Sequence, residues 1–313
     1  MEHRPKLLVI CGPTASGKTA LGVALARAVG GEVVSADSMQ IYRQMDIGTA
    51  KPTVEEMEGV PHHMLDVADP AEDYSVARYV HAADACVQDI LARGRLPIVV
   101  GGTGLYIDNL VAGRDFAPFT GAWREKLQAR AKAEGLPALH DELRRVDPDR
   151  ADRLHPNDEK RILRALEVWY ETGETITAHD ARTQTLPPKY DALRLCLQFS
   201  RREDMWDRID RRVDLMMDQG LEDEVRDLLA SGVPPAATAM QAIGYKEFAA
   251  ALRGEEALAD AVAQVKLRSR QYAKRQLTWF RRTPGVRWIT WEKEPDLSRG
   301  RQEATAYMEE FGI

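Results

Sequence analysis

The sequence predicts an α/β fold in which helices flank a parallel sheet. Short β-rich runs alternate with amphipathic helical patterns along most of the chain, which is typical of a parallel sheet covered on both faces. The first run leads into a glycine-rich turn, and the strand signal disappears between residues 114 and 188. We therefore expect a sheet interrupted by an all-helical insertion and followed by a helical C-terminal region. The four predicted strands are Leu7 to Cys11, Val33 to Ala36, Pro97 to Val100 and Leu193 to Phe199.

The turn behind the first strand reads GPTASGKT and fits the pattern G-x-x-x-x-G-K-[ST] at every position, and a helical pattern from Lys18 to Val29 follows it, as in P-loop NTPase-like folds. Backbone N–H groups and the helix N-terminus are predicted to hold phosphate oxygens, with Lys18 on the outer phosphate and the Thr19 hydroxyl on Mg²⁺. The alternative is a glycine-rich turn that binds no ligand, but such a turn gives the Lys-Thr pair no role in packing. The motif does not identify which phosphate chain is bound. The predicted phosphate-binding residues are Gly12, Pro13, Thr14, Ala15, Ser16, Gly17, Lys18 and Thr19.

Asp37 stands just past the second predicted strand, on the sheet edge where open α/β sheets bind ligands. A carboxylate beside a phosphate loop can ligate Mg²⁺ or act as a general base, and the alternative is a helix N-cap, a position that favours Asp. The third strand ends in VVGGTGLY, so glycines and Thr103 stand where a nucleotide hydrolase often carries a magnesium-holding aspartate. This departure argues against ATP hydrolysis and predicts that a bulky group approaches the backbone there.

Helical periodicity supplies the elements between and after the strands. Apolar residues from Val76 to Ile90 recur at helical spacing and predict a helix over Tyr74 to Arg93 that packs on the sheet. Because only helical patterns occur from 114 to 188, we expect a helical insertion domain there, inside a core domain of residues 1–113 and 189–313. The other predicted helices are Ala122 to Glu134, Pro137 to Arg145 and Glu159 to Glu171 in the insertion, and Glu203 to Asp218, Leu221 to Ala230 and Glu255 to Arg282 in the C-terminal region.

Two patterns of charged or polar side chains have competing interpretations. Arg208 and Arg212 lie at i, i+4 on a predicted helix, where they either clamp a pyrophosphate or form a solvated surface pair with neighbouring aspartates. His62 and His63 suggest a metal pair, but adjacent residues on a strand point to opposite faces, so a structural role is favoured.

A basic strip runs from Gln264 to Arg287. It holds eight Lys or Arg residues and no Asp or Glu, interleaved with Tyr272, Trp279 and Phe280, in a chain whose formal net charge is −6. Cations with stacking surfaces are the pattern expected for single-stranded nucleic acid. A solvated helix face is the alternative, although such faces usually mix both signs.

Composition argues against several classes of protein. Cys11, Cys86 and Cys196 are far apart and form no C-x-x-C pair, so neither a disulfide framework nor a zinc site is predicted. The N-terminal apolar run is too short for a signal peptide, and no uninterrupted apolar stretch approaches membrane-spanning length. We therefore expect a cytoplasmic protein without a membrane partner.

Several longer motifs resemble those of the tRNA dimethylallyltransferases. Beside GPTASGKT, the chain carries SADSMQIYRQMDIGTAKP, HHMLDV, GGTGLYI, HPNDEKRILRALEV, QAIGYKE and QYAKRQLTWFRR, so the resemblance runs from end to end; departures are small, such as Ser269 where Thr is expected. The resemblance implies Mg²⁺-dependent transfer of a dimethylallyl group from dimethylallyl diphosphate to the exocyclic amine of the adenine 3′-adjacent to the anticodon. The loop would then grip the diphosphate of an isoprenoid donor, and the anticodon stem-loop of tRNA would be the partner.

The resemblance also implies roles for individual residues. Asp37 would take the proton from the amine, Arg212 would stabilise the departing pyrophosphate, and Lys18 and Thr19 would assist through charge and the metal. The residues implied to contact tRNA are Asp37, Ser38, Met39, Gln40 and Thr103 around a flipped adenine, and Arg124, Lys160, Arg161, Arg164, Gln241, Gly244, Tyr245, Lys246, Lys274, Arg275, Gln276, Trp279 and Arg281 along the stem-loop.

Two other functions stay open at this point. A P-loop small-molecule kinase, or an isopentenyltransferase acting on free adenine nucleotides, fits the loop but has no need of a basic strip and a helical insertion. A non-catalytic RNA-binding protein conflicts with the intact Lys18, Thr19 and Asp37. We expect a monomer, because a bound tRNA already accounts for the exposed faces.

Overall fold

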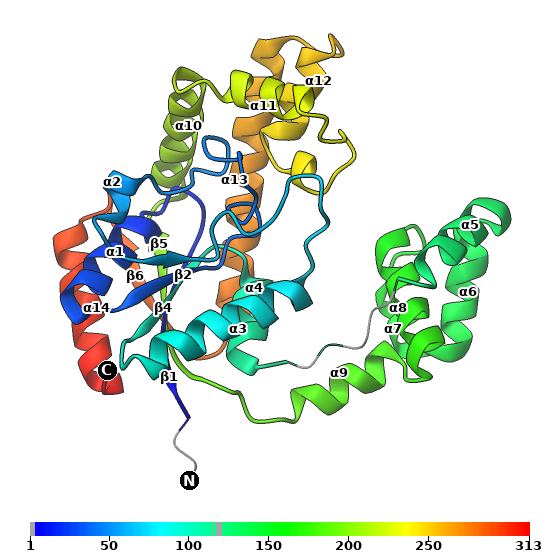
Figure 1. Ribbon diagram of the computed structural model, residues 1–313, viewed down its shortest axis with the longest axis horizontal. Coiled ribbons are helices and arrows are strands. Elements are labelled where there is room, and N and C mark those ends of the chain that lie inside the picture. The colour runs from blue at the N-terminus through cyan, green and yellow to red at the C-terminus, as the bar shows by residue number, and fades with distance from the viewer. Residues whose placement is uncertain (1–3, 115, 117–120) are drawn as a thin grey trace. The chain divides into compact units, whose positions relative to one another are not determined.

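The structure is a computed structural model that describes residues 4–114, 116 and 121–313. Its centre is a sheet of six parallel strands in the order β3-β2-β4-β1-β5-β6 (Figure 1). The predicted α/β class with a parallel sheet is confirmed. The strands are β1 (Lys6–Cys11), β2 (Glu32–Ser35), β3 (His62–His63), β4 (Pro97–Gly101), β5 (Asp191–Phe199) and β6 (Val286–Trp291).

The four predicted strands form the middle of this sheet, and two strands that the sequence pattern does not reveal complete its edges. β1 lies between β4 and β5, and its residues 7–11 are fully buried because both faces of the strand are covered. β3 is only two residues long, and β6 mixes half-exposed with buried positions, so neither appears as a continuous apolar run. β6 pairs with β5 over the whole stretch from Val286 to Trp291.

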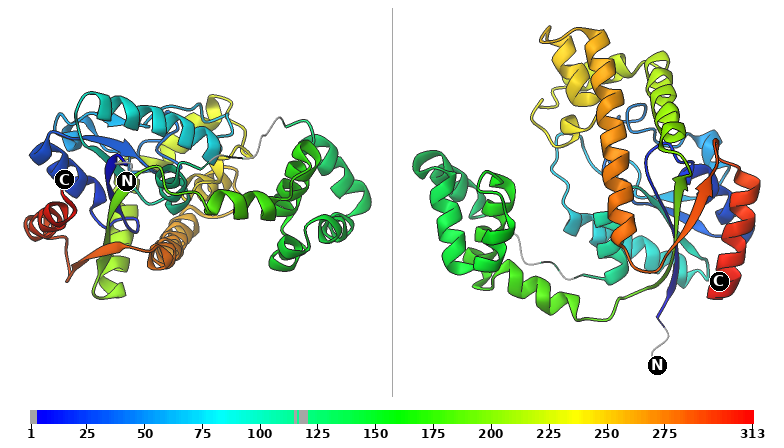
Figure 2. Two further views of the ribbon diagram at one scale, coloured as in Figure 1. Left: turned by 90° about the horizontal axis from the view of Figure 1, so that it is seen from below. Right: turned by 180° about the vertical axis from the view of Figure 1, so that it is seen from behind.

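Helices cover both faces of the sheet (Figure 2). α1 (Lys18–Val29) and α14 (Leu297–Phe311) pack together on one face, and α3 (Val76–Ala92) and α4 (Gly104–Ala112) lie on the other. α3 buries the apolar stripe that the helical spacing predicts. Because parallel strands end at one common edge, this layering brings together the β1–α1 loop, the segment behind β2 and the end of β4.

The C-terminal helices share a separate apolar core. α13 (Leu258–Arg282) packs against α10 and α12, and the core that they share includes Tyr42, Tyr245 and Phe248, all fully buried. Tyr42 belongs to the segment behind β2, so this core ties that segment to the helices. α13 begins three residues later than the Glu255 predicted for it. The remaining helices of this group are α10 (Arg202–Asp218), α11 (Leu221–Ala230), the 3-10 turn η1 (Ala239–Gln241) and α12 (Tyr245–Leu252), and the short α2 (Val54–Met57) precedes β3.

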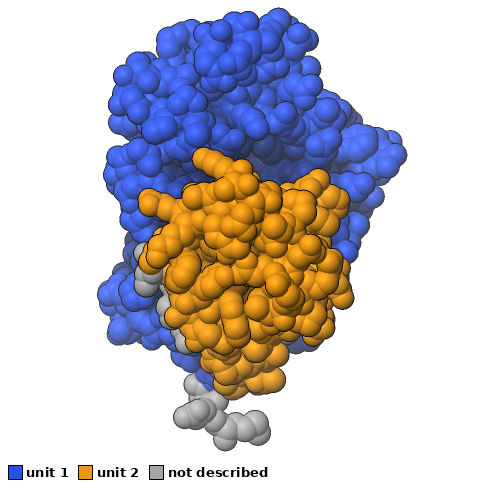
Figure 3. Space-filling view, turned by 90° about the vertical axis from the view of Figure 1, so that its right-hand side faces the viewer, with its two compact units in different colours: residues 1–113, 189–313 blue, residues 114–188 orange. Residues whose placement is uncertain are grey.

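The chain divides into two compact units, residues 1–113 with 189–313 and residues 114–188, which Figure 3 colours separately. The described part of the second unit is helical, and Trp123 stacks on Tyr170 with 4.4 Å between the ring centroids. None of the described helices in either unit has the length and apolar character needed to cross a membrane. The helices of the second unit are α5 (Arg124–Glu134), α6 (Leu136–Val146), α7 (Pro148–Arg153), α8 (Glu159–Thr172) and α9 (Ile176–Gln184).

Candidate active site

The loop that joins β1 to α1 is shaped for an anion. Gly12 has φ of 141°, and a Cβ there would lie 2.8 Å from the carbonyl oxygen of Leu197 in β5, so only glycine fits. Gly17 and Ala15 also have positive φ values, 86° and 61°. No described residue accepts a hydrogen bond from the backbone N–H groups of residues 15–19. These groups and the N-terminus of α1 are therefore available to phosphate oxygens.

Asp37 lies directly behind β2, and its two carboxylate oxygens differ in their surroundings. Oδ1 accepts hydrogen bonds from the backbone N–H groups of Met39, at 2.9 Å, and Gln40, at 3.4 Å, as an N-cap residue does. Oδ2 accepts no hydrogen bond from the part of the chain that the structure describes. One oxygen therefore stabilises the turn, and the other is available to a ligand.

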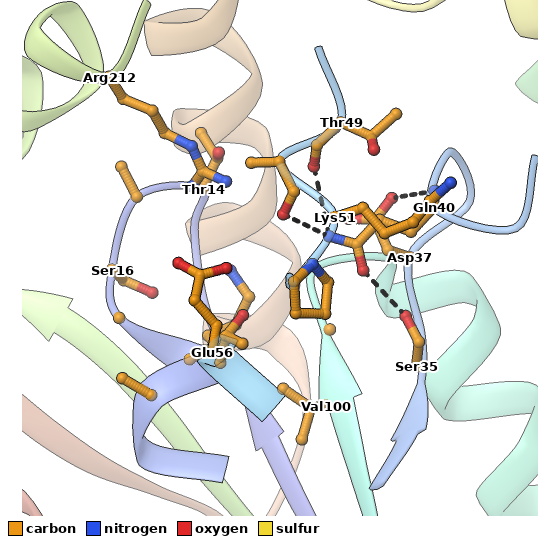
Figure 4. A pocket seen from close by; sticks show the side chains of 18 of the residues that line it. Thr14, Ser16, Ser35, Asp37, Gln40, Thr49, Lys51, Glu56, Val100 and Arg212 are labelled. Carbon is orange, nitrogen blue, oxygen red and sulfur yellow. Dashed lines mark hydrogen bonds between the residues drawn. The ribbon is translucent and has the colours of Figure 1, made fainter. Parts of the chain in front are cut away.

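Asp37 lines a cavity of about 940 Å³ together with Lys18 and Arg212 (Figure 4). In that view Thr14 and Arg212 stand on one side of the cavity and Asp37 stands on the other. The Lys18 ammonium donates to the Pro13 carbonyl at 2.6 Å. Burial lowers the pKa of Arg212, whereas the charge of Asp37 raises it. Two cations suited to a diphosphate and one carboxylate able to take a proton thus share one space.

The C-terminal end of β4 contacts the residue that follows the C-terminal end of β2. A Cβ on Gly101 would overlap the Ala36 backbone. Thr103 strengthens this contact, because its Oγ1 accepts a hydrogen bond from the Ser38 backbone N–H at 3.1 Å. The predicted close approach to these glycines is present: the Ala36 backbone approaches Gly101, and the Trp279 ring approaches Gly104.

Gln276 of α13 also approaches this strand end, and it fastens the phosphate loop. Its Oε1 accepts from the Thr14 backbone N–H at 2.9 Å, and its Nε2 donates to the Gly102 carbonyl at 3.0 Å. The side chain is only 5% exposed. Both ends of its amide are thus bonded inside the protein, which gives Gln276 a structural role, and the contact with RNA that the resemblance implies for it stays a prediction.

A second cavity, of about 280 Å³, shares Asp37 and Arg212 with the first. Gln241 and Gly244, both predicted to contact tRNA, line it, and so does Tyr272 of α13. Asp37 thus stands where a group held in the second cavity meets a group held by the phosphate loop.

Tyr245 has a structural role instead of the predicted contact with tRNA. Its ring is fully buried, and its hydroxyl donates to the Glu224 carboxylate at 2.6 Å. Glu224 also accepts hydrogen bonds from the backbone N–H groups of residues 46–48, so the pair fixes the segment behind β2. The predicted contact is corrected here because a fully buried ring cannot reach RNA, whereas the neighbouring Lys246 is exposed.

Comparisons with known proteins identify the family. A family model described as IPP transferase matches residues 40–283, and one described as Isopentenyl transferase matches residues 5–73. A tRNA dimethylallyltransferase from Acetivibrio thermocellus is 43% identical over 309 residues, which cover 98% of each chain. Another, from Desulforudis audaxviator, is 48% identical over 294 residues, 94% of each chain. The chain belongs to the tRNA dimethylallyltransferase family.

Solved structures of this family have the same fold. The full-length tRNA isopentenylpyrophosphate transferase from Bacillus halodurans is 40% identical, with a TM-score of 0.72 over 98% of each chain. A eukaryotic dimethylallyltransferase acting on tRNA is 32% identical, with a TM-score of 0.83 over 96% of this chain and 77% of that chain. The resemblance seen in the motifs and the P-loop-like fold are both confirmed.

In this tRNA dimethylallyltransferase family member, the basic strip of residues 264–287 divides into two groups. Four of its cations form salt bridges with acidic residues of other elements, namely Lys266, Arg268, Arg270 and Arg287. The other four are exposed and form no salt bridge with any described residue, namely Lys274, Arg275, Arg281 and Arg282. Beside them Trp279, 41% exposed, donates to the Asp108 carboxylate at 2.8 Å. The solvated-face interpretation therefore suits the first group, and the second group is available to phosphates.

The predicted tRNA contacts in residues 114–188 lie on α5 and α8 of the second unit. Arg124 and Arg164 both approach the fully buried Glu167, yet their side chains are 33% and 31% exposed. Arg161 and Lys160 are exposed at the start of α8. Each of the four keeps part of its charge at the surface, and their contact with tRNA stays a prediction.

The described residues fit a magnesium ion that is held mainly by a diphosphate. They contain no group of three or more His, Cys, Asp or Glu side chains that could hold a metal. Thr19 and Asp37 place one hydroxyl and one carboxylate on the cavity wall. Mg²⁺ typically keeps waters and phosphate oxygens beside one or two carboxylates, so this lining is compatible with an ion that a diphosphate brings with it.

We expect the affinity for pyrophosphate to depend on the charge of Lys18. Burial, and secondarily the charge of Arg212, lowers the pKa of Lys18 to about 8. Because an anion favours the ammonium form, affinity should fall as pH rises above about 8, by up to about tenfold per pH unit. Calorimetric titrations with pyrophosphate from about pH 7 to about pH 9.5 measure this, and Lys18→Arg, which keeps its charge, corrects for ionisation of the ligand. If the unsubstituted protein and Lys18→Arg show parallel pH profiles of pyrophosphate affinity, the charge of Lys18 does not control the binding.

Proposed function

We propose that the protein transfers a dimethylallyl group from dimethylallyl diphosphate to the exocyclic amine of the adenine 3′-adjacent to the anticodon of tRNA. The observation that carries this proposal is the single cavity shared by the phosphate loop, Arg212 and Asp37. A phosphate grip opposite a carboxylate suits the transfer of a group away from a diphosphate. The relatives named tRNA dimethylallyltransferases support the same reaction.

Asp37 acts as the base in this proposal. The amine of adenine is a poor nucleophile because its lone pair is delocalised into the purine, so removing a proton during attack lowers the barrier. A bond forms between this nitrogen and C1 of the dimethylallyl group while the bond from C1 to the diphosphate oxygen breaks. The proton passes to Oδ2, while Oδ1 keeps its hydrogen bond from the Met39 N–H and holds the carboxylate in place.

The leaving diphosphate gains negative charge as its bond to carbon breaks. Lys18, Arg212 and the loop amides face that charge from the cavity wall and stabilise it. Thr19 would hold Mg²⁺, which when bound neutralises further charge on the diphosphate oxygens.

The tRNA is held, in this proposal, by the exposed cations of α13 and by those of residues 114–188. The adenine leaves its stack and enters the second cavity beside Asp37, at a cost of a few kcal/mol that is smaller in a loop than in a duplex. A monomer in the cytoplasm suits this role, and all three cysteines are free thiols.

Incubation with radiolabelled dimethylallyl diphosphate and either unmodified tRNA or AMP tests the function. We expect label in the tRNA alone, because a mononucleotide makes none of the contacts with the exposed cations. Label in AMP would favour an isopentenyltransferase acting on free nucleotides. Robust ATP turnover by the purified protein would instead favour a kinase.

The exposed cations of α13 should set the salt dependence of tRNA binding. If Lys274, Arg275 and Arg281 each contact a phosphate, replacing all three by Ala should flatten the log–log slope of affinity against salt by about 2, at about 0.7 per contact. Filter binding across a salt series measures the slope. An unchanged slope would show that these residues do not contact phosphates and belong to a solvated helix face. A matched control removes three exposed arginines that already pair with acidic neighbours, namely Arg202, Arg226 and Arg253.

A further inference from the structure

Two backbone carbonyls of the phosphate loop accept hydrogen bonds from side chains of distant elements. Arg208 of α10 donates from Nε to the Ala15 carbonyl at 3.1 Å. Trp291 of β6 donates from its indole Nε1 to the Ser16 carbonyl at 2.9 Å. Arg208 is itself fixed by a salt bridge to Glu294, just beyond β6. Two consecutive carbonyls of the loop are thus engaged by side chains of other elements, of which Arg208 also lines the cavity and Trp291 is fully buried.

These two contacts determine where the loop amides point. In a trans peptide the C=O group and the N–H group of the next residue point in opposite directions, and no described peptide bond is cis. Because Arg208 fixes the direction of the Ala15 carbonyl, it also fixes the direction of the Ser16 N–H. Trp291 has the same effect on the Gly17 N–H through the Ser16 carbonyl. Ser16 and Gly17 both line the cavity.

The loop needs such support because its conformation is uncommon. Ala15 has φ of 61°, which a residue with a Cβ adopts only where the surroundings enforce it. The same C-terminal segment also covers Gly17, since a Cβ there would lie 3.4 Å from Pro295. Trp291 is fully buried, so it cannot touch a ligand in the cavity and can act only through the loop.

We propose that Trp291 and Arg208 are positioning residues that preset the loop amides for the diphosphate. Both family models end before β6, at residues 283 and 73, so neither covers Trp291. The identification of the ligand as the donor's diphosphate rests on the proposed function, whereas the binding of pyrophosphate itself does not. An amide held in place before binding costs less to order when the anion arrives, so losing either contact should weaken pyrophosphate specifically.

Trp291→Phe tests the proposal, because it removes the indole N–H and keeps an aromatic ring. Calorimetry with pyrophosphate and Mg²⁺ on the full chain should show about a tenfold loss of affinity, the usual effect of one hydrogen bond. The KM for tRNA should stay within about twofold. Trp288→Phe on the same strand is the matched control, because Trp288 lies on the opposite face of the strand. Pyrophosphate affinity within twofold of the parent in a folded Trp291→Phe protein would overturn the proposal.

A second pair of variants keeps the test decisive if Trp291→Phe does not fold. Arg208→Met and Arg211→Met each remove one cation bound to Glu294, but only Arg208 contacts the loop. Arg208→Met should therefore weaken pyrophosphate about tenfold more than Arg211→Met does. Equal losses would overturn the proposal. Transfer of the dimethylallyl group to tRNA is assayed separately. If the unsubstituted protein binds pyrophosphate but transfers no label, only the proposed function is refuted. The pyrophosphate affinities of the variants still decide the role of the loop contacts.

Discussion

Replacing Asp37 by asparagine lowers the rate of dimethylallyl transfer by about 10²–10⁴, measured in single turnovers with saturating tRNA. Asparagine keeps an oxygen that accepts the hydrogen bond from the Met39 N–H, so the turn behind β2 persists. It cannot accept the proton, so the nitrogen must attack without a base. The thermal unfolding midpoint and the affinity for tRNA should therefore change little while the rate falls.

Two controls separate the possible roles of Asp37. Glu56→Gln removes a negative charge from the same cavity, and because the Glu56 carboxylate accepts a hydrogen bond from the Thr53 N–H, we expect only a small change in rate. A magnesium titration of Asp37→Asn distinguishes a base from a metal ligand, since added metal can restore a weakened metal site but cannot replace a base. Near-parental transfer by folded Asp37→Asn would refute the catalytic assignment.

Replacing Arg212 by methionine lowers kcat/KM for the donor by about 10²–10³. The guanidinium is partly buried in the cavity that holds the phosphate loop, where charge on a leaving diphosphate is poorly screened. Methionine preserves the apolar stem of the side chain and removes the charge together with the N–H donors of the guanidinium. Initial rates with varied dimethylallyl diphosphate measure the effect, and KM for tRNA should change little.

The neighbouring charge of Lys18 gives an independent readout of the same variant. Because Arg212 contributes to the lowered pKa of Lys18, Arg212→Met should shift the pH midpoint of pyrophosphate binding upward from about 8. Arg211→Met is the matched control, since the Arg211 side chain is 63% exposed and pairs with Glu294. A fall in kcat/KM of the same size in both variants would contradict a specific role for Arg212.

Local patterns predict the elements of this protein well because each depends on residues close in the sequence. The period of apolar residues predicts α3 to within two residues at its start and one at its end. The loop motif also locates the β1–α1 junction, since glycines at fixed spacing allow the backbone angles that the turn requires. The sequence pattern does not predict β6, because the burial of this strand depends on its pairing with β5, which lies far from it in the sequence.

The two interpretations of Asp37 and of the basic strip show where local reasoning ends. Both interpretations of Asp37 rest on its position behind a strand, and the structure assigns one oxygen to the turn and leaves the other available. The basic strip is one run in the sequence, but Lys266, Arg268 and Arg270 face acidic residues of other helices. Only the positions of those partners distinguish them from Lys274 and Arg275.

The sequence by itself determined the fold class, the phosphate loop, the family and the identity of Lys18 and Asp37 as candidates, because these follow from short motifs and periodic burial. Only the tertiary structure decided that Gln276 and Tyr245 support the site from inside, and that Trp291 reaches Ser16. Gln276 and Trp291 lie 262 and 275 residues from their partners in the loop. Hydrogen bonds over such separations depend on how sheet and helices pack, which no local pattern encodes.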